Sequence, residues 1–186
     1  MKTSVKAGLL FGIIWIILVL IAYLLGYSVD FFIVSELINL FLLLGAIFTG
    51  LYLTKKENNY ETVNAIEDFK IAMQSGIVYT ILITGFVYLY HSQIDESIKE
   101  SITNDRIAAI HEKIPNEETY IKDIQAVDDK WTNKSFDDFI ENQEDQTRTF
   151  VGEFFTSFFH LMILFMFSLF YSFFVTIVIR KIILRQ

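Results

Sequence analysis

Four long apolar blocks constrain this chain more than any other feature of its sequence. Each is at least as long as the roughly 20 residues that a helix needs to cross the hydrocarbon core of a bilayer. They run from about Ala7 to Tyr27, Phe31 to Leu53, Ile71 to His91 and Phe150 to Ile179. Because hydrocarbon offers no water to unpaired backbone groups, each block must be a helix. The sequence therefore predicts an all-α membrane protein built on a four-transmembrane-helix bundle.

The first block could also be a secretory signal peptide, because Lys2 and Lys6 precede it. Its apolar stretch is longer than the usual 7–15 residues of such a signal, and no site with small residues for cleavage follows. Leu24, Leu25 and Tyr27 stand where small residues would be needed. We expect an uncleaved membrane anchor.

The distribution of basic residues predicts the orientation of the four spans. Lysine and arginine flank the N-terminal end, the middle loop (54–70) and the C-terminal tail, whereas the first outer connection has none. The segment 92–149 carries seven basic and fifteen acidic residues. Since short basic flanks stay in the cytoplasm, we expect both termini inside and segment 92–149 outside. Three parts follow: spans one to three (1–91), an acidic outer segment (92–149), and span four with a basic tail (150–186).

The outer segment has the apolar spacing of helices. Isoleucines recur every three to five residues from Ile94 to Ile114, which predicts one unbroken helix continuing from the third span until Pro115 ends it. A second helical piece is expected over Glu117–Trp131. Ser135 and Asp138 resemble a capping box that starts a third helix, expected to run without a break into the fourth span. The apolar stripes could be buried within the segment or could bind a partner.

Rows of small residues mark the faces where the spans could pack. Ser4, Gly8 and Gly12 form one such row in the first span, and Ala72 and Gly76 begin another in the third. Small residues at this spacing let helix backbones approach closely. Packing within one chain and pairing between chains both remain open.

Ionisable and amide side chains lie in the outer halves of the spans, where such groups are energetically unfavourable and often functional. These candidates for one polar intramembrane cluster are Glu36, Asn39, His91, Glu153 and His160. A carboxylate beside an imidazole could move protons, bind a metal or hold a polar head group. The alternative is that the carboxylates and His91 reach the water interface, and that His160 makes one hydrogen bond between helices.

A second group of charged side chains lies on the expected inner face. These candidates for contact with anionic lipid head groups are Lys55, Lys56, Arg180, Lys181 and Arg185. The chain lacks cysteine, and no phosphate loop, zinc-binding histidine pair or nucleophile elbow occurs. We expect no catalytic residues, metal, cofactor or nucleic acid.

Three stretches together resemble a known family. They are the segments 48–59 (FTGLYLTKKENN), 67–79 (EDFKIAMQSGIVY) and 135–148 (SFDDFIENQEDQTR). They are similar to small four-span inner-membrane proteins of Bacteroidota, known only as a domain of unknown function. The resemblance implies a Gram-negative inner membrane, so that the outer segment would be periplasmic. It also implies an accessory role beside a membrane-associated glycosyltransferase, and it brings no catalytic residues.

These observations favour a non-enzymatic accessory or scaffold subunit whose partners are the lipid bilayer and a membrane protein or a second copy of the chain. The rival hypothesis is a small oligomeric transporter or proton-coupled carrier that uses His160 with Glu36 or Glu153. A weaker third hypothesis is a lipid-modifying enzyme with its site at the outer polar cluster.

Overall fold

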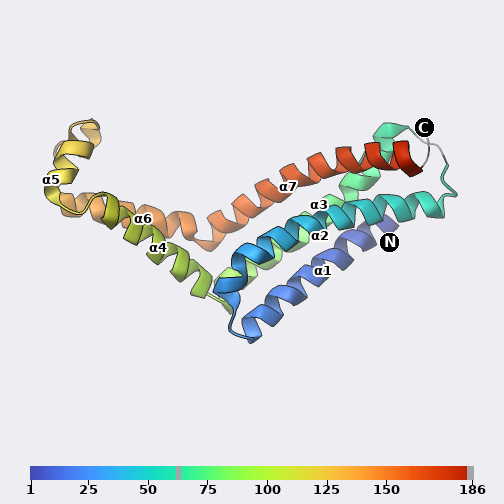
Figure 1. Cartoon of the computed structure of the whole chain (residues 1–186), viewed down its shortest axis with the longest axis horizontal. Helices are drawn as coiled ribbons and strands as arrows, with labels where there is room; N and C mark the ends of the chain where they lie inside the picture. Colours follow the sequence, from blue (N-terminus) through green and yellow to red (C-terminus); the bar gives the residue numbers. More distant parts are fainter. Residues whose placement is uncertain (62–63, 184–186) are drawn as a thin grey trace.

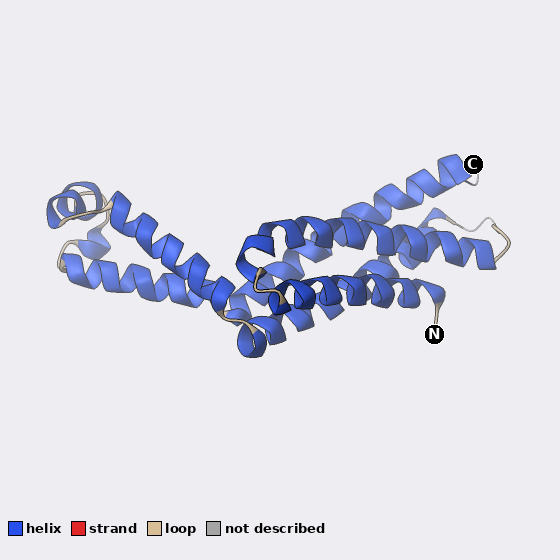
Figure 2. Ribbon diagram, turned by 60° about the horizontal axis from the view of Figure 1, so that its bottom comes forward, coloured by secondary structure: helices blue, strands red, loops and turns tan. Residues whose placement is uncertain are grey.

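The computed structural model describes residues 1–61 and 64–183, and all of its regular secondary structure is helical (Figure 2). Four helices, each with an apolar stretch long enough to span a bilayer, form a bundle. They are α1 (Thr3–Leu24), α2 (Ser28–Glu57), α3 (Ala65–Leu89) and α7 (Glu153–Val178). The all-α, four-span fold class is therefore confirmed.

The bundle is built around α2 and α3, which pack against each other and against both remaining spans. Helix α1 covers one side of this pair and α7 the other (Figure 1). Both chain ends lie at the same end of the bundle, as an even number of crossings requires. The interior is closed: Leu43, Ile47, Tyr79 and Ile83 are completely buried. On the outer surface, by contrast, large apolar side chains such as Phe170 are exposed, as expected for helices that face lipid.

The rows of small residues bring the helices together. Gly8 of α1 lies against the backbone carbonyl of Ser75 in α3, and Gly76 of α3 lies against the hydroxyl of Ser168 in α7. A Cβ atom at either glycine would collide with these atoms. Of the two uses that the sequence left open, packing within one chain is thus observed where α3 meets α1 and where it meets α7.

A helical arm projects from the opposite end of the bundle to the termini (Figure 1). It consists mainly of α4 (Ser97–Lys113) and α6 (Phe136–Val151), which pack side by side. The tip joins them through short elements: α5 (Glu117–Tyr120), the π-helix η2 (Ile121–Gln125) and the 3-10 helix η3 (Asp129–Trp131). The expected single helix over Glu117–Trp131 is therefore broken, while the Ser135–Asp138 capping box is present as predicted.

The arm is not a continuous extension of the spans, and here the sequence-based prediction was wrong. Helix α3 passes into a π-helical turn, η1 (Tyr90–Ile94), and Asp95 is extended before α4 begins. The Asp95 carboxylate accepts hydrogen bonds from the Ser97 N–H (2.9 Å) and hydroxyl (2.6 Å), which starts the new helix. Between α6 and α7 the backbone likewise leaves the helical conformation at one residue, Gly152, with φ −59° and ψ 153°. Both connections between bundle and arm are interrupted helices.

A candidate polar site between the spans

Two of the predicted cluster residues meet between transmembrane helices: Glu36 of α2 and His160 of α7. The Glu36 Oε2 and His160 Nε2 atoms are 3.1 Å apart, and the two side chains are 34% and 15% exposed. The contact is short enough for an ion pair, although Nε2 is not aligned for a hydrogen bond. The pair therefore lies near the surface of the bundle, between two spans that are far apart in sequence.

The contact of the second ring nitrogen, Nδ1, determines which nitrogen of His160 carries a hydrogen. His160 Nδ1 lies 3.1 Å from the backbone oxygen of Thr156. A carbonyl oxygen only accepts, so Nδ1 must carry a hydrogen, as is common when a backbone group fixes the tautomer. A neutral ring would then turn the Nε2 lone pair toward a carboxylate, which is repulsive. The contact is attractive only when one proton lies on Nε2 or on the Glu36 carboxyl group.

His91 approaches this pair from η1, at the end of the third span. Its side chain is buried, with the ring edge-on to Tyr90 at a centroid distance of 5.5 Å. His91 and Glu36 line a cavity of about 20 Å³ together with Trp15 and Ser35. A cavity of this size can hold one water molecule. The arrangement can thus hold a proton and a water, but it is too small for an organic substrate.

The other two members of the predicted cluster lie elsewhere. Asn39 is completely buried, and its Oδ1 accepts a hydrogen bond of 2.7 Å from the hydroxyl of Tyr79. Its Nδ2 has no hydrogen-bond partner within the described part of the chain. Glu153 begins α7 at the base of the arm, where its carboxylate lies 3.8 Å from the Lys99 ammonium. The structure thus divides the five candidates among three places.

No cluster of three metal-ligating side chains occurs among residues 1–61 and 64–183. Between the spans, described polar side chains form the Glu36–His160 contact and the Asn39–Tyr79 hydrogen bond. Asp95 is a carboxyl group just outside the spans, and several hydrogen bonds fix its position. Burial alone would raise the pKa of this carboxyl group, but hydrogen bonds from Ser28, Ser97 and Tyr90 outweigh burial and hold the pKa below its usual value.

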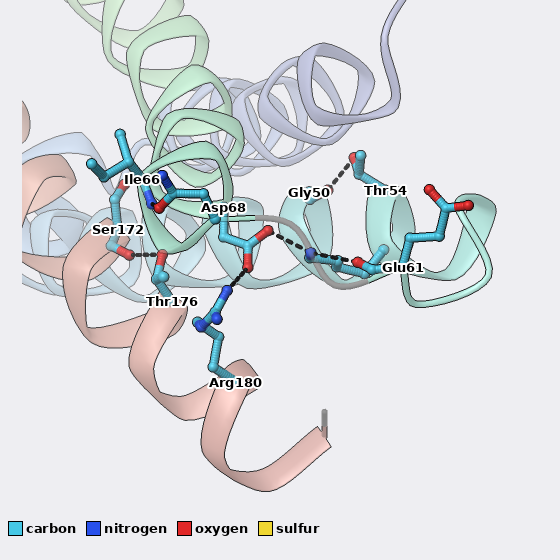
Figure 3. Close-up of polar contacts among 10 residues, drawn as sticks. Gly50, Thr54, Glu61, Ile66, Asp68, Ser172, Thr176 and Arg180 are labelled. Atoms are coloured by element: carbon cyan, nitrogen blue, oxygen red, sulfur yellow. Dashed lines mark hydrogen bonds and ion pairs between the residues drawn. The ribbon is translucent and has the colours of Figure 1, made fainter. Parts of the chain in front are cut away.

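A buried ionic network at the other end of the bundle was missed by the sequence analysis (Figure 3). Asp68, in the first turns of α3, is completely buried. Its Oδ1 lies 2.6 Å from the ammonium of Lys55 in α2, and its Oδ2 accepts a hydrogen bond of 2.9 Å from Arg180, which reaches across from η4 (Ile179–Ile183). The Lys55 ammonium also donates to the Glu61 carbonyl at 3.2 Å. One carboxylate therefore ties three transmembrane helices together.

This network changes the reading of the basic residues that were expected to meet lipid head groups. Lys55 is only 2% exposed, so its ammonium serves Asp68 rather than the membrane surface. Arg180 pairs with Asp68 and remains 24% exposed, while Lys56 and Lys181 are exposed. Arg185 lies outside the described residues. For the exposed cations, head-group contact stays a prediction. The signal for the network was present in the sequence: one acidic side chain, Asp68, and two basic ones, Lys55 and Arg180, lie at the same end of three spans.

The fold and these contacts define a multi-pass helical membrane protein with a closed bundle and a projecting arm. Residues 6–183 match the family described as Protein of unknown function (DUF4199), and the chain belongs to that family. Neither a curated protein nor a solved structure matches the chain. The resemblance found in three stretches of sequence is thus confirmed for the family, whereas an origin in Bacteroidota stays a prediction.

Proposed function

We propose that this protein is a non-enzymatic accessory subunit, in which a membrane bundle carries a rigid helical arm that binds a partner protein. The observation that carries this proposal is the folded tip of the arm. Tyr120, Trp131 and Phe139 are each at least 96% buried there, in a small core separate from that of the bundle. At 1.5 Å per residue, the 17 residues of α4 hold this tip about 25 Å from the end of the bundle.

Hydrogen bonds fix the shape of the tip in addition to its aromatic core. The Tyr120 hydroxyl donates to the carbonyls of Trp131 (3.2 Å) and Lys134 (3.0 Å), and the Gln125 amide donates to the same two oxygens. Two apolar side chains nevertheless stay on the surface, with Val127 82% and Ile121 50% exposed. A tip that is rigid and partly apolar is suited to bind a protein surface.

The orientation belongs to the same proposal. Basic residues gather at the end of the bundle that carries both termini, and the arm is acidic. The positive-inside rule then favours a cytoplasmic location for the termini and an extracytoplasmic one for the arm. In a Gram-negative inner membrane the arm would lie in the periplasm. A membrane-associated glycosyltransferase is the partner that the family resemblance suggests.

The test is site-specific crosslinking in native membranes. A photoreactive residue replaces Val127 at the tip, and a matched control replaces Glu141, an exposed residue of α6. Quantitative mass spectrometry then identifies the adducts after mild solubilisation. The proposal expects one stoichiometric partner at position 127 and little at 141. Recovery of the protein alone, or adducts that are equal at the two positions, would refute a binding role for the tip.

A proton-coupled carrier is the second candidate, because the Glu36–His160 contact is attractive only when a proton lies on Nε2 or on the carboxyl group. The closed interior argues against it: Leu43, Ala46 and Ile47 are fully buried in α2, and the nearby cavity of about 20 Å³ has room for no more than a water molecule. The discriminating variant is His160→Leu. A carrier loses proton-linked flux in reconstituted vesicles, whereas an accessory subunit keeps its crosslinked partner at full yield.

A further inference from the structure

An apolar groove lies between the first turns of α3 and the last turns of α7, and it has a volume of about 470 Å³. Its walls are almost entirely hydrocarbon, and two cations stand at one end. Its lining includes Ile66 and Phe69 of α3, Phe173 and Ile177 of α7, and the cations Arg180 and Lys181. The groove is separate from the Glu36–His160 contact and from the arm.

The part of the lining that comes from α7 and η4 follows one helix face. Phe173, Thr176, Ile177, Arg180 and Lys181 are spaced three or four residues apart, or are neighbours, so they form a continuous stripe. Phe173 precedes Arg180 by seven residues, which is a rise of about 10 Å along the helix axis. A molecule that follows this stripe meets positive charge first and hydrocarbon one to two turns deeper.

The buried network positions one of the two cations. The Asp68 carboxylate forms ion pairs with Lys55 and Arg180. Lys55 is buried like Asp68, whereas Arg180 is 24% exposed. Of these three charged side chains, Arg180 alone is more than marginally exposed, and it lines the groove. Lys181, also at the groove, is exposed and adds a second cation there. Asp68 thus acts as a buried support that holds Arg180 over the end of the groove.

We propose that this groove binds one anionic phospholipid, with its phosphate at Arg180 and Lys181 and an acyl chain between α3 and α7. The charge and the depth select this occupant. The lining belongs to two membrane-spanning helices, so the groove opens toward lipid rather than water. Polar head groups occupy several ångströms outside the roughly 30 Å hydrocarbon core, which matches the order of cations and apolar walls. Basic pockets between transmembrane helices bind anionic head groups by this logic.

This inference goes beyond the accessory role, since it concerns a different part of the molecule and a different kind of ligand. It does not depend on the identity of any partner of the arm. A failure to find a protein partner leaves it untouched, and a failure to find bound lipid leaves the role of the arm untouched.

The test measures lipid binding to the full chain in detergent by native mass spectrometry. Dioleoylphosphatidylglycerol is the anionic probe, and dioleoylphosphatidylcholine has the same chains without net charge. The proposal expects the anionic lipid to bind with one-to-one stoichiometry and at least tenfold more tightly. Lys181→Gln should weaken its binding about fivefold, the effect of one basic residue near an anionic surface. Arg180 is left in place because its loss would also disturb Asp68.

Two further variants separate a site from general attraction. Lys56→Gln removes an exposed charge at the end of α2, at the same end of the bundle but outside the groove, and should change binding less than twofold. Ile177→Trp fills the groove and should reduce binding of both lipids. Equal losses for Lys181→Gln and Lys56→Gln, or equal binding of the two lipids, would overturn the proposal.

Discussion

Replacing Asp68 by asparagine provides a sharp test of the ionic network. The side chain keeps its shape but loses the charge that faces Lys55 at 2.6 Å and Arg180 at 2.9 Å. Lys55 is 2% exposed, so its ammonium cannot turn to water without moving the helix ends. Leaving a buried charge without its partner destabilises proteins by about 3–5 kcal/mol. We expect about 3 kcal/mol, since Lys55 keeps its hydrogen bond to the Glu61 carbonyl.

The measurement is reversible unfolding of the detergent-solubilised protein by sodium dodecyl sulfate. Tryptophan fluorescence can follow the bundle separately, because Trp15 lies within it and the second tryptophan, Trp131, can be replaced by phenylalanine. A loss of 3 kcal/mol lowers the folding equilibrium constant roughly a hundredfold. The matched control is Lys56→Met, an exposed neighbour whose replacement should stay within about 0.5 kcal/mol.

A double variant identifies the cause of the loss. If the unpaired Lys55 is responsible, Lys55→Met combined with Asp68→Asn should recover at least about 1 kcal/mol relative to Asp68→Asn alone. Arg180, at 24% exposure, is already partly in contact with solvent. An Asp68→Asn protein as stable as the wild type, or a double variant with strictly additive losses, would refute the reasoning.

Three further predictions concern packing and acid stability. Gly76→Val places side-chain atoms against the Ser168 hydroxyl and should cost about 1–3 kcal/mol in the same unfolding assay. Gly85→Ala, in the same helix but facing open space, should be neutral or stabilise by up to about 1 kcal/mol; equal losses would contradict the close approach of α3 and α7. Because the pKa of Asp95 is lowered on folding, its contribution is present above the unfolded value of about 3.9 and is lost as pH falls through the folded value. Ser97→Ala should lose less stability than the wild type between pH 5 and pH 2.5, and parallel pH profiles would refute this.

The spans were predictable because one physical requirement, backbone hydrogen bonding in hydrocarbon, acts on every residue of a long apolar block. The breaks at Asp95 and Gly152 were not, because apolar spacing continues across both and hides them. Local chemistry marked them nevertheless: the Asp95 carboxylate can accept hydrogen bonds from Ser97, two residues later, and Gly152 lies between Val151 and Glu153.

The polar contacts were predictable only in part. Glu36 and His160 do meet, because α2 and α7 pack against each other and the two residues lie at similar depth. Asn39 and Glu153 do not join them, because each has a nearer partner on another helix. Asn39 accepts a hydrogen bond from Tyr79, and Glu153 lies beside Lys99. Neither partner was among the candidate residues. Pairing of this kind depends on helix rotation, and rotation is set by packing rather than by depth.

The two interrupted helices at the base of the arm have a mechanical consequence. Glu96 and Gly152 line the same polar cavity, so both connections lose helical continuity at one level. A continuous helix would carry a displacement of the tip into the spans through its backbone. Here the base of the arm is held to the bundle by side chains instead: Ile98 of α4 is buried in the bundle core, and the Lys99 ammonium lies 3.8 Å from the Glu153 carboxylate. The angle between arm and bundle is therefore set by side-chain packing at this level, and not by helical hydrogen bonding.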